Sequence, residues 1–481
     1  MFNFKTSYTQ LNACFYQVCE PSPINDPKLI LFNDRLASEL DINKESLSEK
    51  EIAQLLCGNK TLQDHPPISQ AYAGHQFGHF TLLGDGRAHL LGEHITKEKK
   101  RVDVQLKGSG QTPYARRGDG KATLGPMLRE YIISEAMHAL NIPTTRSLAV
   151  VATSEPVYRD TQLPGAILTR IANSHIRIGT FEFAASKQDP NLIEELLNYT
   201  IKRHYPKLSD SKNKALALLD AVMQSQIKLI CHWLRVGFIH GVMNTDNISI
   251  AAQSIDYGPC AFMNIYDPET CYSSIDHMKR YAFAKQSAIL QWNLARFAES
   301  LLPIIDKDIK KAIALAEKSL KTFPKHFEAA WLEMMRSKLG LLEAKKEDIK
   351  LIGDLLSLMQ QSKADYTHTF LVLQDQFEDT SPLYQTKVFR AWKTRWETRY
   401  KQEKRHRRDQ LALMQAHNPL IIPRNHLMED ALTQAQKGEF NPFRELLEAL
   451  QNPYLSSKNL KAYQSLPSDD FEKNYQTFCG T

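Results

Sequence analysis

The sequence lacks the features that mark membrane, secreted and zinc-binding proteins. No run of about 18 apolar residues occurs, so no membrane-spanning helix is expected. The seven cysteines are scattered and none is spaced Cys-x-x-Cys, which argues against a zinc site and against a disulfide-dense scaffold. The chain starts without a basic segment followed by an apolar one, so we expect no secretory signal and a cytoplasmic location in a bacterium.

The net charge is modest for the length of the chain. A charge of +6 over 481 residues suits an acidic ligand such as a nucleotide, and it indicates neither a nucleic-acid nor a membrane partner. With 42% hydrophobic and 24% charged residues, the composition is that of an ordinary soluble globular protein. The length exceeds one minimal domain, so we expect two or three packed units.

The first third of the sequence has the alternation of β-strands. Residues 80–83 and 88–93 look like two strands, and Gly84-Asp85-Gly86 between them predicts the tight turn of a hairpin. Residues 101–107 alternate as a strand should. A glycine-containing break follows, and residues 128–140 then have helical periodicity.

The rest of the chain is mostly helical. Apolar residues recur at helical spacing in several segments: 210–236, 292–302, 309–322 and 327–341. Residues 387–415 predict one basic amphipathic helix, which contains the run Lys404-Arg405-His406-Arg407-Arg408. This run could bind nucleic acid or an acidic partner, but a solvated helix face is the favoured interpretation.

One segment carries most of the chemistry: His240-Gly241-Val242-Met243-Asn244-Thr245-Asp246-Asn247, followed by Asp256-Tyr257-Gly258. Protein kinases open their catalytic loop with His-Arg-Asp, place a metal-binding Asn seven residues after the His, and continue to Asp-Phe-Gly. His240 and Asn247 keep that spacing, and Asp256 stands where the metal-binding Asp would. Val242 takes the place of the catalytic Asp, so the metal ligands are kept and the usual base is lost.

Asp246 is the best candidate for a replacement base. A carboxylate beside a metal ligand can take a proton from an incoming hydroxyl, although it could instead be a metal ligand itself. Asn247 and Asp256 offer oxygen ligands from neighbouring loops, which suit a phosphate-bound Mg²⁺. We expect His240 to organise the backbone.

Charged residues upstream suit phosphate. Lys107 ends a predicted strand and Glu130 begins a predicted helix, as in the lysine–glutamate pair of kinases; the alternative is a surface salt bridge or no contact. Arg170 and Arg177 lie in a mainly apolar stretch and need an anionic partner, either a phosphate or a structural Asp or Glu. The loop 114–121, with two arginines and two glycines, suits polyphosphate or is a charged surface turn.

Several motifs together are highly specific: Ala71-Tyr72-Ala73-Gly74-His75-Gln76-Phe77-Gly78, Gln105-Leu106-Lys107-Gly108-Ser109-Gly110-Gln111-Thr112-Pro113-Tyr114, Leu128-Arg129-Glu130-Tyr131, Ile142-Pro143-Thr144-Thr145-Arg146, the loop that begins at His240, Asp256-Tyr257-Gly258-Pro259, Gln291-Trp292-Asn293-Leu294-Ala295-Arg296, and Asn418-Pro419 with Arg424-Asn425-His426. In these motifs, which span nearly the whole chain, the sequence resembles the selenoprotein O family.

The resemblance implies an α+β, bilobal protein-kinase-like (pseudokinase) fold with a β-rich N-lobe, a helical C-lobe and additional C-terminal helices. We accordingly expect an N-terminal region and N-lobe over 1–152, a C-lobe with the catalytic loop and metal site over 153–345, and a helical extension with a redox cysteine tail over 346–481. It also implies ATP bound in a reversed orientation. AMP then passes to Ser, Thr or Tyr hydroxyls of protein substrates, and bacterial relatives are also credited with UMP transfer from UTP.

The resemblance also implies roles for single residues. Lys107 would contact phosphate with Glu130 paired to it, and Asp246 would accept the proton. Asn247 and Asp256 would bind Mg²⁺, with Mn²⁺ as a substitute. The remaining nucleotide-binding residues would be Gly84, Gly86, Arg87, Asp119, Gly120, Arg170 and Arg177.

The tail departs from the family pattern. Cys479 is followed by Gly480 and Thr481, where many bacterial members have two serines, and Asn264 stands where relatives often have Asp. The family uses the tail cysteine in redox regulation, which suggests a disulfide between Cys479 and an internal cysteine. Our candidate partner is Cys271, fifteen residues after Asp256.

Two other functions stay open. The first is a small-molecule phosphotransferase of kinase-like fold. Val242 argues against it, because those enzymes have their catalytic base at the position that Val242 occupies. The second is a catalytically inactive, nucleotide-binding pseudokinase.

Overall fold

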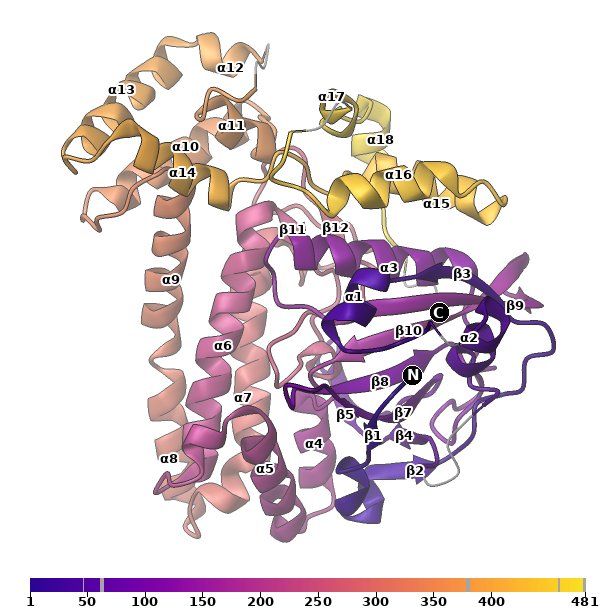
Figure 1. Ribbon diagram of the computed structural model, residues 1–481. Coiled ribbons are helices and arrows are strands. Elements are labelled where there is room, and N and C mark those ends of the chain that lie inside the picture. Colours follow the sequence, from indigo (N-terminus) through magenta and orange to yellow (C-terminus); the bar gives the residue numbers. More distant parts are fainter. Residues whose placement is uncertain (46, 61–64, 378–380, 457–458, 479–481) are drawn as a thin grey trace.

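The protein has a sheet-rich part and a helical part, as Figure 1 shows. The computed structural model describes residues 1–45, 47–60, 65–377, 381–456 and 459–478. Most of the first 172 residues form or cover one sheet, and from Ile178 onward helices dominate. No helix within these described ranges is long and apolar enough to cross a bilayer.

The main sheet is antiparallel and has eight strands in the described residues, in the order β2-β4-β7-β8-β10-β9-β3, with β1 paired to β7. The strands are β1 (Phe4–Lys5), β2 (Tyr16–Val18), β3 (Lys28–Phe32), β4 (Ile68–Gln70), β7 (Ala88–Ile95), β8 (Arg101–Lys107), β9 (Arg146–Tyr158) and β10 (Gln162–Ala172). The predicted strand 101–107 is thus confirmed, and it lies in the middle of the sheet.

Helices cover both faces of this sheet. Because successive side chains of a strand point to opposite faces, Val102, Val104 and Leu106 of β8 share one face, where they pack with α1 (Asp34–Glu39) and α2 (Glu49–Leu56). The other face packs against α3 (Leu124–Ala139), which begins four residues before the predicted start. The sheet is therefore a buried middle layer, and its strand ends are the places left for a site.

The predicted hairpin of residues 80–83 and 88–93 is wrong. The first segment is β6 (His79–Leu82), and it pairs with β5 (Ala73–Gln76) in a separate two-stranded sheet. The tight turn lies instead at Phe77 and Gly78, whose φ angles of 51° and 92° are the positive values that two-residue hairpin turns require.

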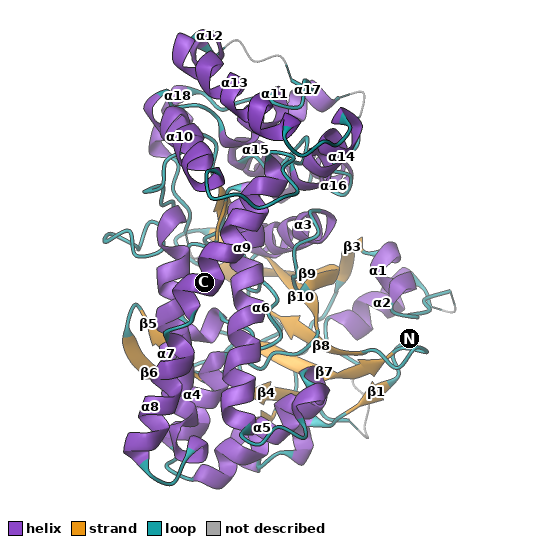
Figure 2. Cartoon of the chain, turned by 90° about the vertical axis from the view of Figure 1, so that its left-hand side faces the viewer, coloured by secondary structure: helices purple, strands orange, loops and turns teal. Residues whose placement is uncertain are grey.

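The helical part is built around α6 (Lys214–Val236), which starts where the Asn213 side chain accepts a hydrogen bond from Leu216 N and ends at Gly237, with φ 76°. Figure 2 shows α6 running beside α7 and α9. The neighbouring helices are α4 (Ile178–Ser186), α5 (Pro190–His204), α7 (Gln286–Ile305), α8 (Ile309–Leu320) and α9 (Phe323–Lys338). The short strands β11 (Phe238–Ile239) and β12 (Ala261–Phe262) frame the segment that begins at His240.

The last third of the chain is also helical. Its elements are α10 (Asp348–Gln361), α11 (Tyr366–Val372), α12 (Pro382–Gln385), α13 (Lys387–Lys401), α14 (Arg407–His417), α15 (Asn425–Gln436), α16 (Asn441–Leu450), α17 (Leu460–Tyr463) and α18 (Asp469–Asn474). Of these, α15 and α16 pack on the outer side of α3 (Figure 1).

The single basic helix expected over 387–415 is also wrong, because the chain breaks between α13 and α14. At the break the carboxylate of Glu403 accepts hydrogen bonds from Leu342 N and Glu343 N, both at 3.1 Å, and Lys404 has a φ of 52°. The buried Glu403 carboxylate thus ties the segment between the two helices to residues 342 and 343, and part of the basic run lies in a loop.

Candidate active site

Four charged side chains from distant segments meet at the end of β8. Lys107 Nζ lies 2.7 Å from Glu130 Oε2 of α3, and it also contacts Asp256 Oδ1. Arg170 of β10 donates from Nε to Glu130 Oε1 at 2.7 Å, and its Nη2 lies 3.3 Å from Asp256 Oδ1. The predicted contact between Lys107 and Glu130 is therefore present, in a network that Arg170 and Asp256 complete.

The strand register explains why these groups meet. Arg170 faces Gln105 across the antiparallel β10–β8 pair, and Lys107 lies two residues further along β8, on the same face. Glu130 is 2% exposed, so its charge needs these cations nearby. Burial acts to raise the pKa of Glu130, but Arg170 and Lys107 outweigh it and lower the pKa below its ordinary value.

Asp256 is held charged by the same cations. Burial acts to raise its pKa, yet Lys107 and Arg170 hold the pKa well below its usual range. Its φ of 69° lies in the left-handed region, which residues other than glycine seldom adopt and which concentrates at functional sites. The side chain is 37% exposed and lines a cavity, so a charged carboxylate faces that space.

The loop that begins at His240 is fixed from behind. His240 Nε2 lies 2.9 Å from Ile255 O, and His240 N donates to Gln286 Oε1 at 3.1 Å. A side chain at Gly241 would collide with the backbone of Pro259, and its φ is 84°. His240 thus ties its own loop to the segment that carries Asp256, which matches the organising role expected for it.

Asp246 and Asn247 lie on a short 3-10 turn, η4 (Thr245–Asn247). Asp246 is 7% exposed, and no described residue forms a hydrogen bond with its Oδ1. Burial raises the pKa of Asp246 to about 6, against the lowering effect of Arg177. A carboxylate with this proton affinity suits a general base near neutral pH.

Two glycines let other segments pack against Asp246. A Cβ at Gly74 of β5 would collide with the Asp246 carboxylate, and a Cβ at Gly179 of α4 would collide with Ala73 O and lie 3.3 Å from Asp246 Cα. The small β5–β6 sheet therefore closes directly over the carboxylate, which is the cause of its burial.

Arg177 is placed behind this loop. Its Nη1 donates to the backbone oxygen of Asp246 at 3.0 Å, and its Nη2 lies 3.5 Å from Asp85 Oδ1. The guanidinium also stacks on the ring of Tyr72, 4.4 Å from the centroid. Both predicted arginines thus have carboxylate partners from the protein, the structural alternative that the sequence left open.

In front of these groups lies an open cavity of about 590 Å³. Five of the residues predicted to bind nucleotide or metal line it, namely Gly86, Arg87, Asp119, Gly120 and Asp256. Lys107, Glu130, Arg170 and Arg177 are buried side chains of its back wall and do not line the open space. Gly84 is set back as well, and a Cβ there would collide with the ring of Tyr114.

Other residues also line the cavity: Tyr114 and Arg117 belong to the loop 114–121 that the sequence pointed to, whereas Tyr72 and Arg159 were given no role. Tyr72 and Tyr114 add aromatic rings, and Arg117 and Arg159 add positive charge. Arg159 donates from Nη1 to Asp119 Oδ2 at 2.9 Å, and this hydrogen bond lowers the pKa of Asp119. Arg159 comes from the β9–β10 turn, about 40 residues away in sequence, so no local pattern marks it.

The donor atoms fit a divalent cation shared with phosphate. The Asn247 amide donates from Nδ2 to Val242 O at 3.1 Å, which leaves the amide oxygen as the atom for a metal, and Asp256 offers a charged carboxylate. No cluster of three or more His, Cys, Asp or Glu suited to a metal occurs among the described residues. Such an ion would need phosphate or water oxygens to complete its shell, as Mg²⁺ commonly does.

The C-terminal tail crosses this region. Thr477 N donates to Tyr272 O at 2.8 Å, and Thr477 Oγ1 donates to Pro259 O at 2.7 Å, beside the Asp256 segment. Cys479 lies outside the described residues, so its pairing with Cys271 stays a prediction. Burial, followed by Asp276, raises the pKa of the Cys271 thiol to about 11.

Helix α3 is held on its outer side by the same tail. Arg129 donates to Glu429 Oε1 of α15 at 2.8 Å, to Tyr475 Oη at 3.2 Å and to Cys260 O at 2.8 Å. Arg129 directly precedes Glu130, so the residue that pairs with Lys107 sits on a helix fixed at three points.

A cavity lined by arginines, faced by the charged carboxylate of Asp256 and backed by buried cations, suits a ligand that carries phosphate, as in a nucleotide-handling transferase. Comparison with known proteins gives the family: the sequence profile described as "Protein adenylyltransferase SelO" matches residues 1–451. The chain belongs to this family, whose names indicate nucleotidyltransferase activity on a nucleotide substrate.

Full-length relatives agree. The chain is 54% identical to "Protein nucleotidyltransferase YdiU" of Nitrosococcus oceani, over 100% of this chain and 97% of the relative. It is 52% identical to the protein of that name from Syntrophotalea carbinolica (100% and 98% covered) and 51% identical to the one from Clostridium perfringens (100% and 98%).

Proposed function

We propose that this protein transfers AMP from ATP to Ser, Thr or Tyr hydroxyls of other proteins, and also UMP from UTP. The observation that carries the proposal is the position of the base. Val242, 6% exposed, stands where kinases have their catalytic Asp, and the buried Asp246, with a pKa of about 6, lies four residues further on. Because the candidate base lies at a different position from the base of kinases, we infer that a different phosphate reacts, the α-phosphate in place of the γ-phosphate.

The proposal includes a bilobal, kinase-like arrangement, with the chain divided near residues 152 and 345. The order of the elements along the chain supports this arrangement. Strand β8 ends on Lys107, helix α3 carries Glu130, and the helical part that follows carries the loops of Asp246 and Asp256. In kinases the corresponding lysine and glutamate hold each other and the nucleotide phosphates.

The nucleotide would lie in the 590 Å³ cavity with its β- and γ-phosphates against the arginines. Arg87 and Arg117 line the cavity directly, beside the backbone of Gly86 and Gly120. Lys107, Arg170 and Arg177 would act from the back wall, where they now neutralise carboxylates. In this proposal the α-phosphate faces Asp246, and the diphosphate is held as the leaving group.

The transfer is a substitution at the α-phosphorus. The acceptor oxygen forms a bond to phosphorus, the bond to the oxygen that bridges to the β-phosphate breaks, and diphosphate leaves. The proton of the acceptor hydroxyl passes to the carboxylate of Asp246. Asn247 and Asp256 would hold Mg²⁺ or Mn²⁺, which supplies positive charge to the departing diphosphate.

The test uses ATP labelled at either the α- or the γ-phosphate, incubated with Mg²⁺ and the purified protein. Label retained on protein from α-labelled ATP alone, and lost in Asp256→Asn, is the expected result; α-labelled UTP tests UMP transfer in parallel. Label from the γ-position would overturn the proposal in favour of a phosphotransferase. ATP binding without any transfer, unchanged by Asp246→Asn, would favour an inactive pseudokinase.

A further inference from the structure

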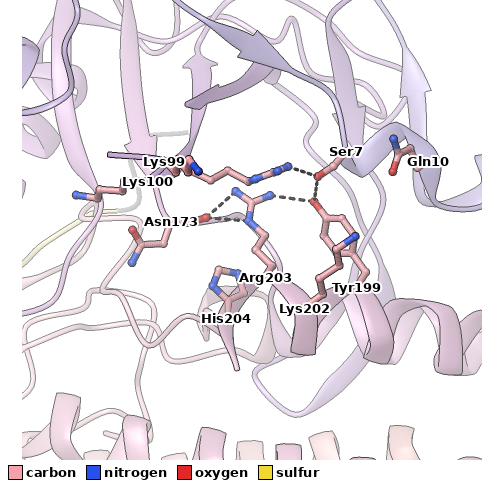
Figure 3. A pocket seen from close by; sticks show the side chains of 10 residues that line it. Ser7, Gln10, Lys99, Lys100, Asn173, Tyr199, Lys202, Arg203 and His204 are labelled. Carbon is pink, nitrogen blue, oxygen red and sulfur yellow. Dashed lines mark hydrogen bonds between the residues drawn. The ribbon is translucent and has the colours of Figure 1, made fainter. Parts of the chain in front are cut away.

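A second cavity lies at the opposite end of strand β8. It has a volume of about 490 Å³ and is formed by the β7–β8 turn, the end of α5 and the N-terminal segment (Figure 3). Arg101, the first residue of β8, lines this cavity, whereas Lys107, the last, belongs to the back wall of the nucleotide cavity. Six residues of strand separate them by roughly 20 Å, so the two cavities are distinct.

Positive charge dominates this second cavity. Five basic residues line it, namely Lys99, Lys100, Arg101, Lys202 and Arg203. Burial lowers the pKa of the sixth candidate, His204, to about 3, so it is neutral at physiological pH.

Only two of these five charges are balanced. Arg101 Nη1 lies 2.5 Å from Glu93 Oε2, and Arg203 Nη2 lies 2.5 Å from Asp103 Oδ1. Lys99, Lys100 and Lys202 form no ion pair with any residue in the described ranges. The cavity therefore carries an excess of three positive charges.

Helix stabilisation explains only part of this charge. Lys202 and Arg203 lie in the last turn of α5, where cations interact favourably with the helix dipole. Lys99 and Lys100 belong to the β7–β8 turn, so the dipole of α5 does not account for their charges. Lys99 has a φ of 65°, a conformation better suited to glycine, so the turn presents a lysine where glycine would be less strained.

The floor of the cavity is built in advance. Arg203, whose side chain is 6% exposed, donates from Nε to Asn173 O at 3.1 Å and from Nη1 to Tyr199 Oη at 2.9 Å. Ser7 Oγ joins the same network, 3.0 Å from Tyr199 Oη, as Figure 3 shows. A fixed guanidinium floor beneath unpaired lysines reduces the ordering that a ligand must impose.

We propose that this cavity binds a chain of two or more phosphates, either an inorganic oligophosphate or the phosphate tail of a nucleotide. The lining has no aliphatic side chain, which disfavours an apolar ligand. Three lysines without an ion-pair partner in the described chain line this one cavity, which suits an anion that carries several charges, and ammonium groups are common phosphate ligands. The site does not depend on the proposed transfer reaction.

The first experiment titrates inorganic triphosphate into the full-length protein by calorimetry. The double variant Lys99→Glu/Lys202→Glu reverses two of the unpaired charges, and we expect its binding at this site to be weaker by at least about tenfold. Binding in the nucleotide cavity is common to variant and wild type, so the difference between them reports the second cavity alone.

The matched control is Lys97→Glu. Lys97 lies in the same turn, but its ammonium is directed to Asp41 at 3.7 Å and its side chain is 86% exposed, outside the cavity. It makes the same charge change per residue and should leave triphosphate binding unchanged. The milder Lys99→Ala/Lys202→Ala, checked for an unchanged melting temperature, guards against misfolding of the reversed variant.

Two results would overturn the proposal: equal triphosphate binding in wild type and both double variants, or the same loss in Lys97→Glu. A parallel titration with ATP separates the two sources of phosphate. Equal lysine-dependent affinity for triphosphate and ATP identifies the phosphate chain as the ligand, and tighter ATP binding identifies a nucleotide.

Discussion

Two loops bring a carboxylate to the same region, and they give it opposite proton affinities. Asp246 is enclosed by the β5–β6 sheet, its Oδ1 has no hydrogen-bond partner in the described chain, and its pKa rises to about 6. Asp256 contacts Lys107 and Arg170, and its pKa falls well below the ordinary value. Arg177 donates to the backbone oxygen of Asp246, so its fork does not pair with that carboxylate. Contacts with cations, more than burial, thus separate the pKa values of the two carboxylates.

Removing the charge of Asp256 should have the largest effect on activity. We expect Asp256→Asn to lower AMP transfer by about 1000-fold or more, because a neutral amide holds a divalent cation less well and leaves Lys107 and Arg170 without that counter-charge. Asparagine is chosen because it tolerates a positive φ. Label transfer from α-labelled ATP measures the effect, with the exposed Asp210→Asn as the control. Retention of a tenth of the activity would contradict the metal role.

Removing the base should have the next largest effect. Loss of a general base typically costs about 10²- to 10⁴-fold in rate, so Asp246→Asn should lower kcat by this amount while ATP binding stays unchanged. Single-turnover kinetics and nucleotide titration separate the two quantities. A wild-type rate would assign the proton to another group.

The pH dependence should sharpen the comparison. Because Asp246 must be deprotonated to accept a proton, kcat/KM should rise about tenfold per pH unit below pH 6 and level off above it. Arg177 lowers the pKa of Asp246, so Arg177→Gln should move the inflection to higher pH. An inflection that does not move would mean that another group titrates.

The raised pKa of Asp246 should also lower the free energy of unfolding at neutral pH. Its folded pKa of about 6 exceeds the ordinary 3.8, so between these values the folded state binds more protons than the unfolded state, and stability falls as pH rises. At pH 7 this amounts to at most about 3 kcal/mol. Asp246→Asn should therefore raise the unfolding free energy at pH 7 but not at pH 4, as chemical denaturation would measure. Equal effects at both pH values would contradict this explanation.

The smallest effect concerns the glycine that encloses Asp246. Gly74→Ala places a methyl group against the carboxylate and should destabilise the protein by about 1–3 kcal/mol. Its control is Gly353→Ala in α10, where a Cβ meets nothing within 4 Å and should stabilise by up to about 1 kcal/mol. Thermal unfolding compares them, and equal shifts would argue against tight packing at Gly74.

Local sequence patterns correctly predicted the elements whose formation depends mainly on residues close together in the sequence. The alternation of residues 101–107 and the periodicity of α6 gave real elements, and kinase-like spacing related Lys107 to Glu130. The hairpin failed because positive φ values at Phe77 and Gly78 turn the chain earlier than the Gly84–Gly86 pair suggests.

What the sequence missed depends on tertiary contacts. Arg159 reaches Asp119 from a turn distant in sequence, and the buried Glu403, just after α13, accepts hydrogen bonds from backbone amides some 60 residues away. The division at 152 and 345, and the roles of the site residues, stay predictions.

The attachment of α3 has a consequence for control of the enzyme. Many kinases are switched off by swinging the helix that carries the glutamate away from its lysine. Here Arg129 fastens that helix to α15, to the tail and to Cys260 O, so the helix cannot leave without detaching the C-terminal part. A switch that separates Lys107 from Glu130 by moving α3 would therefore also have to break the contacts of Arg129 with α15 and the C-terminal tail.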